Sequence, residues 1–164
     1  MTDNVISIKV AGLGGMGVLK ASFILAELLF QQGYDVKKAE VHGMSQRGGS
    51  ICSDVRFGKK VLSPIIPAKA ADYLLLLQED QRPLYEDVCS DKTVVLTPEA
   101  IDVEKLETPR SLNIAMLGLL SCRLDIPAEA WKEMIRQTLP EKLHQMNETA
   151  FELGRQGHCC GESR

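Results

Sequence analysis

The sequence predicts a single α/β domain with a three-layer α/β/α architecture, a mixed twisted sheet and a Rossmann-like strand–helix–strand start. Three observations lead to this fold class. A strand pattern over residues 5–11 is followed by a glycine-rich turn and an amphipathic segment. Extended segments in the middle of the chain are joined by a Gly-Lys-Lys turn, which predicts a hairpin and therefore some antiparallel pairing. Residues 111–124 are apolar on nearly every face, which predicts a buried helix.

The N-terminal third gives the strand, turn and helix in order. Residues 5–11 alternate and then become apolar, and the predicted strand stops at the glycine turn. Apolar residues then recur at spacings of three and four, which predicts that they form the buried face of a helix ended by Gly33. Residues 34–41 predict a second strand. The turn residues are Gly12, Leu13, Gly14, Gly15, Met16 and Gly17, and the apolar helix positions are Leu19, Phe23, Ala26 and Phe30.

The remainder alternates short strands with helices. Residues 50–57 and 61–64 are expected to pair as a hairpin around residues 58–60. Short buried strands are expected at 71–77 and 93–96, with a helical segment near 82–88 between them.

After the buried helix, Asp125 is a candidate cap for a helix that has Pro127 in its first turn. That helix carries Trp131, Ile135 and Leu139 on one face. A last helix over 141–153 is expected to end at Gly154. The chain is thus one domain over residues 1–154, with a flexible tail at 155–164.

Composition excludes several classes of function. The 164 residues are 45% hydrophobic and carry a net charge of −3 without long charged runs, so nucleic acid is not an expected partner. No stretch approaches the roughly 20 apolar residues of a membrane span. The polar first residues lack a secretion signal, so we expect a cytoplasmic protein. Five scattered cysteines predict reduced thiols, and their spacing does not fit an iron–sulfur cluster.

The glycine turn has two interpretations. Gly12-x-Gly14-x-x-Gly17, after a strand and before a helix, is the context in which backbone N–H groups receive a phosphate. The acidic residue that would hold a ribose about 20 positions further on has Glu40 as its candidate. The alternative is that these glycines only make a tight strand-to-helix turn. A dinucleotide site is disfavoured because the chain continues into a hairpin rather than a second βαβ half.

A second segment, residues 40–50, combines three glycines with polar side chains. It reads Glu-Val-His-Gly-Met-Ser-Gln-Arg-Gly-Gly-Ser and follows the end of a predicted strand, where α/β sheets open their ligand crevice. The guanidinium of Arg47 suits a carboxylate or phosphate, and Gln46 and Ser50 can fix its orientation. So polar a loop contributes little to a core, which favours a functional surface. For His42 alone, a hydrogen bond to a neighbour is the simpler role.

These two segments, with Ser63-Pro64-Ile65-Ile66-Pro67 and Ala71-Asp72, resemble the gamma domain of 2-oxoacid:ferredoxin oxidoreductases. Within this family, the form of the second motif at residues 40–49, Glu-Val-His-Gly-Met-Ser-Gln-Arg-Gly-Gly, is most similar to that of the beta subunit of indolepyruvate oxidoreductases. The likeness extends through Asn113, at the start of the apolar helix, to about Gly154. The stretch from Leu96 to Arg110 is short for this family.

The resemblance implies a division of labour between subunits. A large subunit carries thiamine diphosphate and iron–sulfur clusters, decarboxylates the 2-oxoacid and passes electrons to ferredoxin, while coenzyme A takes the acyl group. The gamma domain packs over the thiamine-binding domains and helps to shape the coenzyme A side of the site. It holds no cofactor firmly and supplies no catalytic residue. The residues implied to bind the ligand or partner are Gly12, Gly14, Gly15, Gly17, His42, Gln46, Arg47, Gly48, Gly49, Ser50 and Asn113.

Other interpretations remain open at this stage. The glycine turn also fits a freestanding nucleotide- or flavin-binding module, and the same fold could serve as a purely structural interaction protein. A chain with such an interface can form a homodimer when expressed alone. His158-Cys159-Cys160 is interpreted as an incidental exposed end rather than a metal site. The choice of 2-oxoacid lies mainly in the large subunit.

Overall fold

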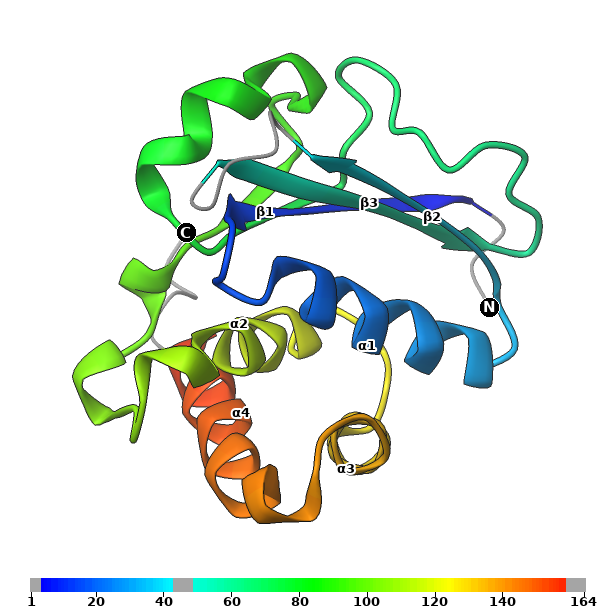
Figure 1. Ribbon diagram of the computed structural model, residues 1–164. Coiled ribbons are helices and arrows are strands. Elements are labelled where there is room, and N and C mark those ends of the chain that lie inside the picture. The colour runs from blue at the N-terminus through cyan, green and yellow to red at the C-terminus, as the bar shows by residue number, and fades with distance from the viewer. Residues whose placement is uncertain (1–3, 43–48, 159–164) are drawn as a thin grey trace.

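A computed structural model describes residues 4–42 and 49–158, and it shows a five-stranded mixed sheet (Figure 1). The strand order is β2-β3-β1-β4-β5. Strand β3 runs antiparallel to both of its neighbours, whereas β4 and β5 run parallel to β1. The expected mixed sheet is therefore confirmed. The strands are β1 (Ile6–Leu13), β2 (Asp35–His42), β3 (Ser50–Gly58), β4 (Tyr73–Leu76) and β5 (Val94–Leu96).

The two faces of the sheet are covered differently. The four α-helices lie on one face, and the other carries the 3₁₀ segment η1 (Glu79–Val88) and the loop over residues 59–72 (Figure 1). The helices are α1 (Val18–Gln31), α2 (Leu112–Ser121), α3 (Ala128–Thr138) and α4 (His144–His158). Four short 3₁₀ turns complete the described part of the chain: η2 (Pro98–Ala100), η3 (Val103–Lys105), η4 (Pro109–Ser111) and η5 (Glu141–Leu143).

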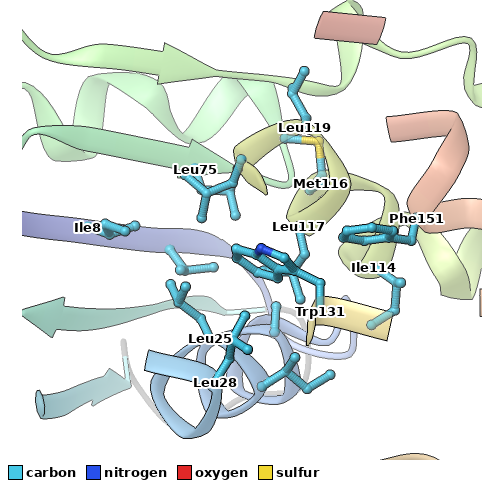
Figure 2. Packing of buried hydrophobic residues seen from close by; sticks show 14 of the residues in the cluster. Ile8, Leu25, Leu28, Leu75, Ile114, Met116, Leu117, Leu119, Trp131 and Phe151 are labelled. Carbon is cyan, nitrogen blue, oxygen red and sulfur yellow. The ribbon is translucent and has the colours of Figure 1, made fainter. Parts of the chain in front are cut away.

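The main core lies between the sheet and the helices (Figure 2). Trp131 and Phe151 are fully buried there, with ring centroids 6.1 Å apart. Helix α2 contributes buried residues all around its surface, as its uniform apolarity predicts. A smaller cluster on the opposite face packs Ile66 and Tyr85 against the sheet. Both faces of the central strands are thus buried, which explains their continuous apolar runs.

Two glycines allow α2 and α4 to cross closely. A Cβ atom on Gly118 would lie 2.0 Å from the carbonyl oxygen of Phe151, and one on Gly154 would lie 1.8 Å from that of Ala115. No larger residue fits either position without moving a helix. Gly154 therefore serves packing inside a helix, and the prediction that it ends the helix is wrong. Helix α4 continues to His158, so the first four residues of the expected tail, 155–158, are helical.

The expected hairpin between 50–57 and 61–64 is also wrong. Strand β3 pairs instead with β2, which precedes it, and with β1. The segment after Gly58 leaves the end of β3 and crosses the face of the sheet, held by the Arg56 guanidinium, which donates to the carbonyl oxygens of Ser63 and Ile65. Prolines at positions 64 and 67 disfavour a ladder here because they lack an N–H group.

Helix α1 buries the face opposite to the predicted one. Phe23 and Phe30 are 44% and 68% exposed, whereas Ile24, Leu25 and Leu28 are buried. Both stripes have helical spacing, so periodicity alone could not decide between them. The predicted end of the helix is confirmed: Gly33 has φ of 89°, a conformation that glycine adopts without strain.

The predicted cap of α3 is wrong in detail. Its N-cap is Pro127 and no side chain caps it, so Asp125 does not have that role. The helix itself is confirmed, with Trp131 and Ile135 fully buried.

A buried ion pair fastens the loop over 59–72 to the sheet. Lys9 on β1 and Asp54 on β3 are cross-strand neighbours, and they form a salt bridge with side chains 8% and 5% exposed. The second carboxylate oxygen of Asp54 accepts a hydrogen bond of 3.0 Å from the N–H of Ile66. Two buried charges thus pair with each other and fix a loop that has no regular hydrogen-bonding ladder.

Candidate functional site

The candidate site lies where the carboxyl ends of β1 and β4 meet. These strands are parallel neighbours, but β1 continues into α1 on the helical face and β4 continues into η1 on the other face. The two connections therefore leave in opposite directions, which opens a crevice at the end of the sheet. The glycine turn at residues 12–17 follows β1 at this end of the sheet.

Positive φ angles at two glycines shape the turn. Gly15 and Gly17 have φ of 88° and 80°, values that side chains other than glycine rarely adopt. The N–H of Leu13 donates to the sulfur of Met16 at 3.4 Å, which closes the turn on itself. A Cβ atom on Gly15 would meet nothing within 4 Å, so this tip is open to an approaching molecule.

Asn113 ties the turn to helix α2. Its amide nitrogen donates to the carbonyl oxygen of Gly17 at 3.2 Å, and its amide oxygen accepts from the N–H of Ile114. A Cβ atom on Gly17 would lie only 2.4 Å from that amide nitrogen. Asn113 is 6% exposed, so in this chain it supports the turn rather than presenting its amide to solvent. The predicted residues Gly17 and Asn113 are thus brought together.

The second predicted segment reaches the same edge. The N–H of Gly14 donates to the carbonyl oxygen of Gly49 at 2.9 Å. The Ser50 hydroxyl donates to the amide oxygen of Gln81 at 2.5 Å, which links the segment to η1. Gln46, Arg47 and Gly48 lie outside the described residues, as does the side chain of His42. The predicted residues that the structure describes therefore gather at one edge, and Gln81 joins them.

A cavity of about 390 Å³ adjoins this edge. Leu77 belongs to its wall and also lies 3.1 Å from where a Cβ atom on Gly12 would sit, so the cavity begins behind the turn. Its lining is mostly apolar, with two carboxylates, and one oxygen of Glu79 is buried without a hydrogen-bond partner. The lining residues are Leu77, Gln78, Glu79, Pro98, Glu99, Val103, Leu106, Pro109 and Leu112.

Sequence reasoning missed Gln78, Glu79 and Gln81. They lie directly after β4, so the rule that ligands bind beyond the carboxyl ends of strands could have found them. The apolar walls of the cavity come from the 3₁₀ turns between residues 98 and 111, where no periodic pattern exists to read.

The sheet order argues against a dinucleotide site of the Rossmann type. In that fold the acidic ribose ligand follows a strand adjacent to β1. Here β3 lies between β1 and β2, so Glu40 is two strands away from β1, about 10 Å. Glu40 instead forms a salt bridge with Lys38 on its own strand. It is therefore not placed to hold a ribose at the glycine turn.

The buried thiol beside the ion pair is unsuited to nucleophilic chemistry. Cys52 is 7% exposed, and burial is the main cause that raises the pKa of its thiol. Burial likewise raises the pKa of the neighbouring Tyr85 to about 12. Both groups are therefore neutral at physiological pH. Cys52 is a packing residue, as its place in a predicted strand indicates.

The glycine turn and the sheet order together define a class of α/β domain with a mixed sheet. It differs from a dinucleotide-binding domain because β1 and β2 are not neighbours in the sheet. The chain belongs to the pyruvate ferredoxin/flavodoxin oxidoreductase family, whose model matches residues 7–101. That match includes the turn, the second segment and the start of the cavity wall. The chain is accordingly a subunit of an oxidoreductase of this family.

Similar proteins agree with this assignment. The indolepyruvate oxidoreductase subunit IorB of Thermococcus kodakarensis is 30% identical, with 90% of this chain and 93% of that protein covered. Their alignment spans 188 residues, more than this chain possesses, so the relative carries insertions.

Two solved structures share the fold. The gamma subunit of a keto/oxoacid ferredoxin oxidoreductase from Geobacter sulfurreducens has a TM-score of 0.78 at 20% identity, with 95% of this chain and 99% of that chain covered. The 2-oxoglutarate:ferredoxin oxidoreductase of Magnetococcus marinus, solved with 2-oxoglutarate, coenzyme A and succinyl-CoA, has a TM-score of 0.81 at 17% identity. That match covers 97% of this chain but 32% of the other. Among the described residues, no helix is both long and apolar enough to cross a membrane.

Proposed function

We propose that this chain is the small subunit of a 2-oxoacid:ferredoxin oxidoreductase that acts on indolepyruvate or another aryl pyruvate. In this proposal it packs on a large subunit that carries thiamine diphosphate and iron–sulfur clusters, and ferredoxin is reached only through the complex. The relatives named indolepyruvate oxidoreductase subunits support the substrate class.

One contact supports placing the interface with the large subunit at the glycine turn. The hydrogen bond from the N–H of Gly14 to the carbonyl oxygen of Gly49 joins the two glycine-rich segments at the carboxyl edge of the sheet. The glycine turn thus meets the described end of the second motif, at Gly49. Because Gly15 projects no side chain, and even an added Cβ atom would meet nothing within 4 Å, the backbone of another subunit can approach closely there.

The proposed work of this chain is positioning. Asn113 and the link between Ser50 and Gln81 hold the turn and the second segment in place, and no residue here is assigned to the bond-breaking steps. Arg47 is proposed to bind an anionic group of coenzyme A, since a guanidinium forms two parallel hydrogen bonds to a phosphate. The relative solved with coenzyme A bound supports a contact with this substrate.

Anaerobic co-purification from the native cells tests the subunit assignment. The tagged chain should bring down a large brown protein that contains thiamine diphosphate and absorbs as an iron–sulfur protein. A chain that elutes alone, or with a bound nucleotide or flavin, would instead favour the freestanding module.

Substitution in the complex tests the role of Arg47. Arg47→Ala should raise the KM for coenzyme A by about tenfold or more, as expected when a charge-assisted hydrogen bond is lost. Lys59→Ala is the matched control, because it removes a positive charge from an exposed residue just beyond the opposite end of β3. Equal KM values for the two variants would favour a purely structural role for this chain.

A further inference from the structure

Strand β2 forms an edge of the sheet. Its hydrogen-bonded neighbour is β3, and the strand order places no described strand on its other side. It is eight residues long, without a proline, and the protection it carries consists of charged side chains, among them Lys37, Lys38 and Glu40. Such charges repel a partner strand unless that strand places opposite charges against them. An edge of this length is a template on which another strand can pair.

The register of the sheet shows which way the β2 side chains face. Lys38 lies opposite Val55 of β3, which belongs to the main core, so Lys38 and Glu40 face the helical side. Val41 lies opposite Cys52, which belongs to the smaller cluster, so Ala39 and Val41 face the other side. Val41 is 51% exposed, an unusual apolar exposure on a strand.

We propose that β2 pairs antiparallel with β2 of a second copy of this chain, centred on Ala39, and joins two sheets into one. A two-fold axis perpendicular to the sheet keeps the two helical faces on the same side, so opposed residues must have numbers of the same parity. In the register centred on Ala39, Lys38 of each copy lies opposite Glu40 of the other. The neighbouring register, centred on Lys38, opposes two lysines and places Val36 against Glu40.

Charge and apolar contacts both favour the register centred on Ala39. Lys38 and Glu40 already form a salt bridge within the strand. Pairing of two copies converts two such bridges into a square of alternating charges, an arrangement in which each cross-strand pair is attractive. On the opposite side, the aliphatic stem of Lys37 from one copy covers the exposed Val41 of the other. The small Ala39 lies at the axis, where its methyl group meets its own copy without crowding.

Charge reversal tests the proposal on the purified full-length chain. Sedimentation of the wild type should give twice the monomer mass at micromolar to tens of micromolar concentrations. Lys38→Glu and Glu40→Lys should each weaken the dimer by about tenfold or more, because each change turns two attractive cross-strand pairs into repulsive ones. The double variant Lys38→Glu/Glu40→Lys restores opposite charges and should recover the dimer.

Two results would overturn the proposal. A wild-type chain that stays monomeric at all these concentrations would show that β2 does not self-pair. A dimer that neither single reversal weakens would place the interface elsewhere, for example on the exposed phenylalanines of α1. Thermal melting of each variant checks that a loss of dimer is not a loss of fold.

Discussion

Replacement of Gly154 by alanine measures how tightly α2 and α4 cross. The new Cβ atom would lie 1.8 Å from the carbonyl oxygen of Ala115, whereas contacts of this kind are essentially never shorter than 3.0 Å. The helices must therefore separate by about 1 Å or more, which loosens the packing of the buried Phe151 that precedes Gly154 on α4. Overpacking typically costs about 1–3 kcal/mol and a contact this short belongs at or somewhat above the upper end, while the higher helix propensity of alanine returns about 1 kcal/mol.

The expected net loss is about 2–3 kcal/mol of unfolding free energy, or a fall in Tm of about 5–10 °C for a chain of this length. Chemical denaturation followed by circular dichroism measures it. Gln156→Ala is the control, because Gln156 is exposed on the same helix and its replacement should change stability by less than about 0.5 kcal/mol. A Gly154→Ala variant as stable as the control would refute the close crossing of the two helices.

Three further variants probe the turn, the buried ion pair and the surface charges. Gly17→Ala should lose about 2–3 kcal/mol through its positive φ and its clash with Asn113, and in denaturant titrations the double variant with Asn113→Ala should lose less than the sum of the two single variants, because the clash is then absent. Lys9→Met should cost about 3 kcal/mol by the same measurement, because it leaves the buried Asp54 carboxylate without its cation. Arg136 on α3 donates a hydrogen bond to Glu148 and thereby lowers the pKa of that carboxyl group. The contribution of this pair to stability is therefore present above the unfolded-state pKa of about 4.3, and it is lost as the pH falls through the lower folded-state pKa. Glu148→Gln should therefore cost about 0.5–1 kcal/mol at pH 7 and progressively less as the pH falls below about 4.3, which unfolding curves over this pH range will test.

Local sequence patterns were sufficient to predict an element where one interaction determines its structure. The alternation over 5–11, the turn that follows it and the uniformly apolar α2 were all predicted, because burial of strands and of a fully apolar helix leaves few alternatives. The end of α1 at Gly33 was equally readable, because a positive φ there requires glycine.

Tertiary structure decided the rest. Helix α1 carries two apolar stripes, and contact with the sheet, absent from any local pattern, selected the one that includes Leu25. The partner of β3 was predicted wrongly because the Gly-Lys-Lys pattern indicates a turn but not which strands pair. The pairing of β3 with β1 includes the salt bridge between Lys9 and Asp54, which are 45 positions apart, so no local pattern reveals it. Gly154 of α4 resembles a helix end in sequence and becomes a packing position only when α2 is present.

The same division applies to the candidate site. The glycine turn, Ser50 and Asn113 were predicted, and the structure joins the turn to Asn113 and joins Ser50 to Gln81, which follows β4. The cavity with Glu79 was not predicted, because its walls come from 3₁₀ turns that have no periodicity. Arg47 and its neighbours remain predictions of the sequence.

The most direct test of the proposed interface compares two matched glycine variants in binding to the large subunit. Gly15 and Gly33 have φ of 88° and 89°, and a Cβ atom on either would meet nothing within 4 Å, yet they lie at opposite ends of α1. Asparagine tolerates positive φ better than other residues, so Gly15→Asn and Gly33→Asn should lower the stability of the isolated chain by similar small amounts. We predict that Gly33→Asn binds the large subunit like the wild type and that Gly15→Asn binds about tenfold more weakly or worse, because its side chain occupies the surface where the partner approaches. Equal binding by the two variants would contradict the assignment of the glycine turn to the subunit interface.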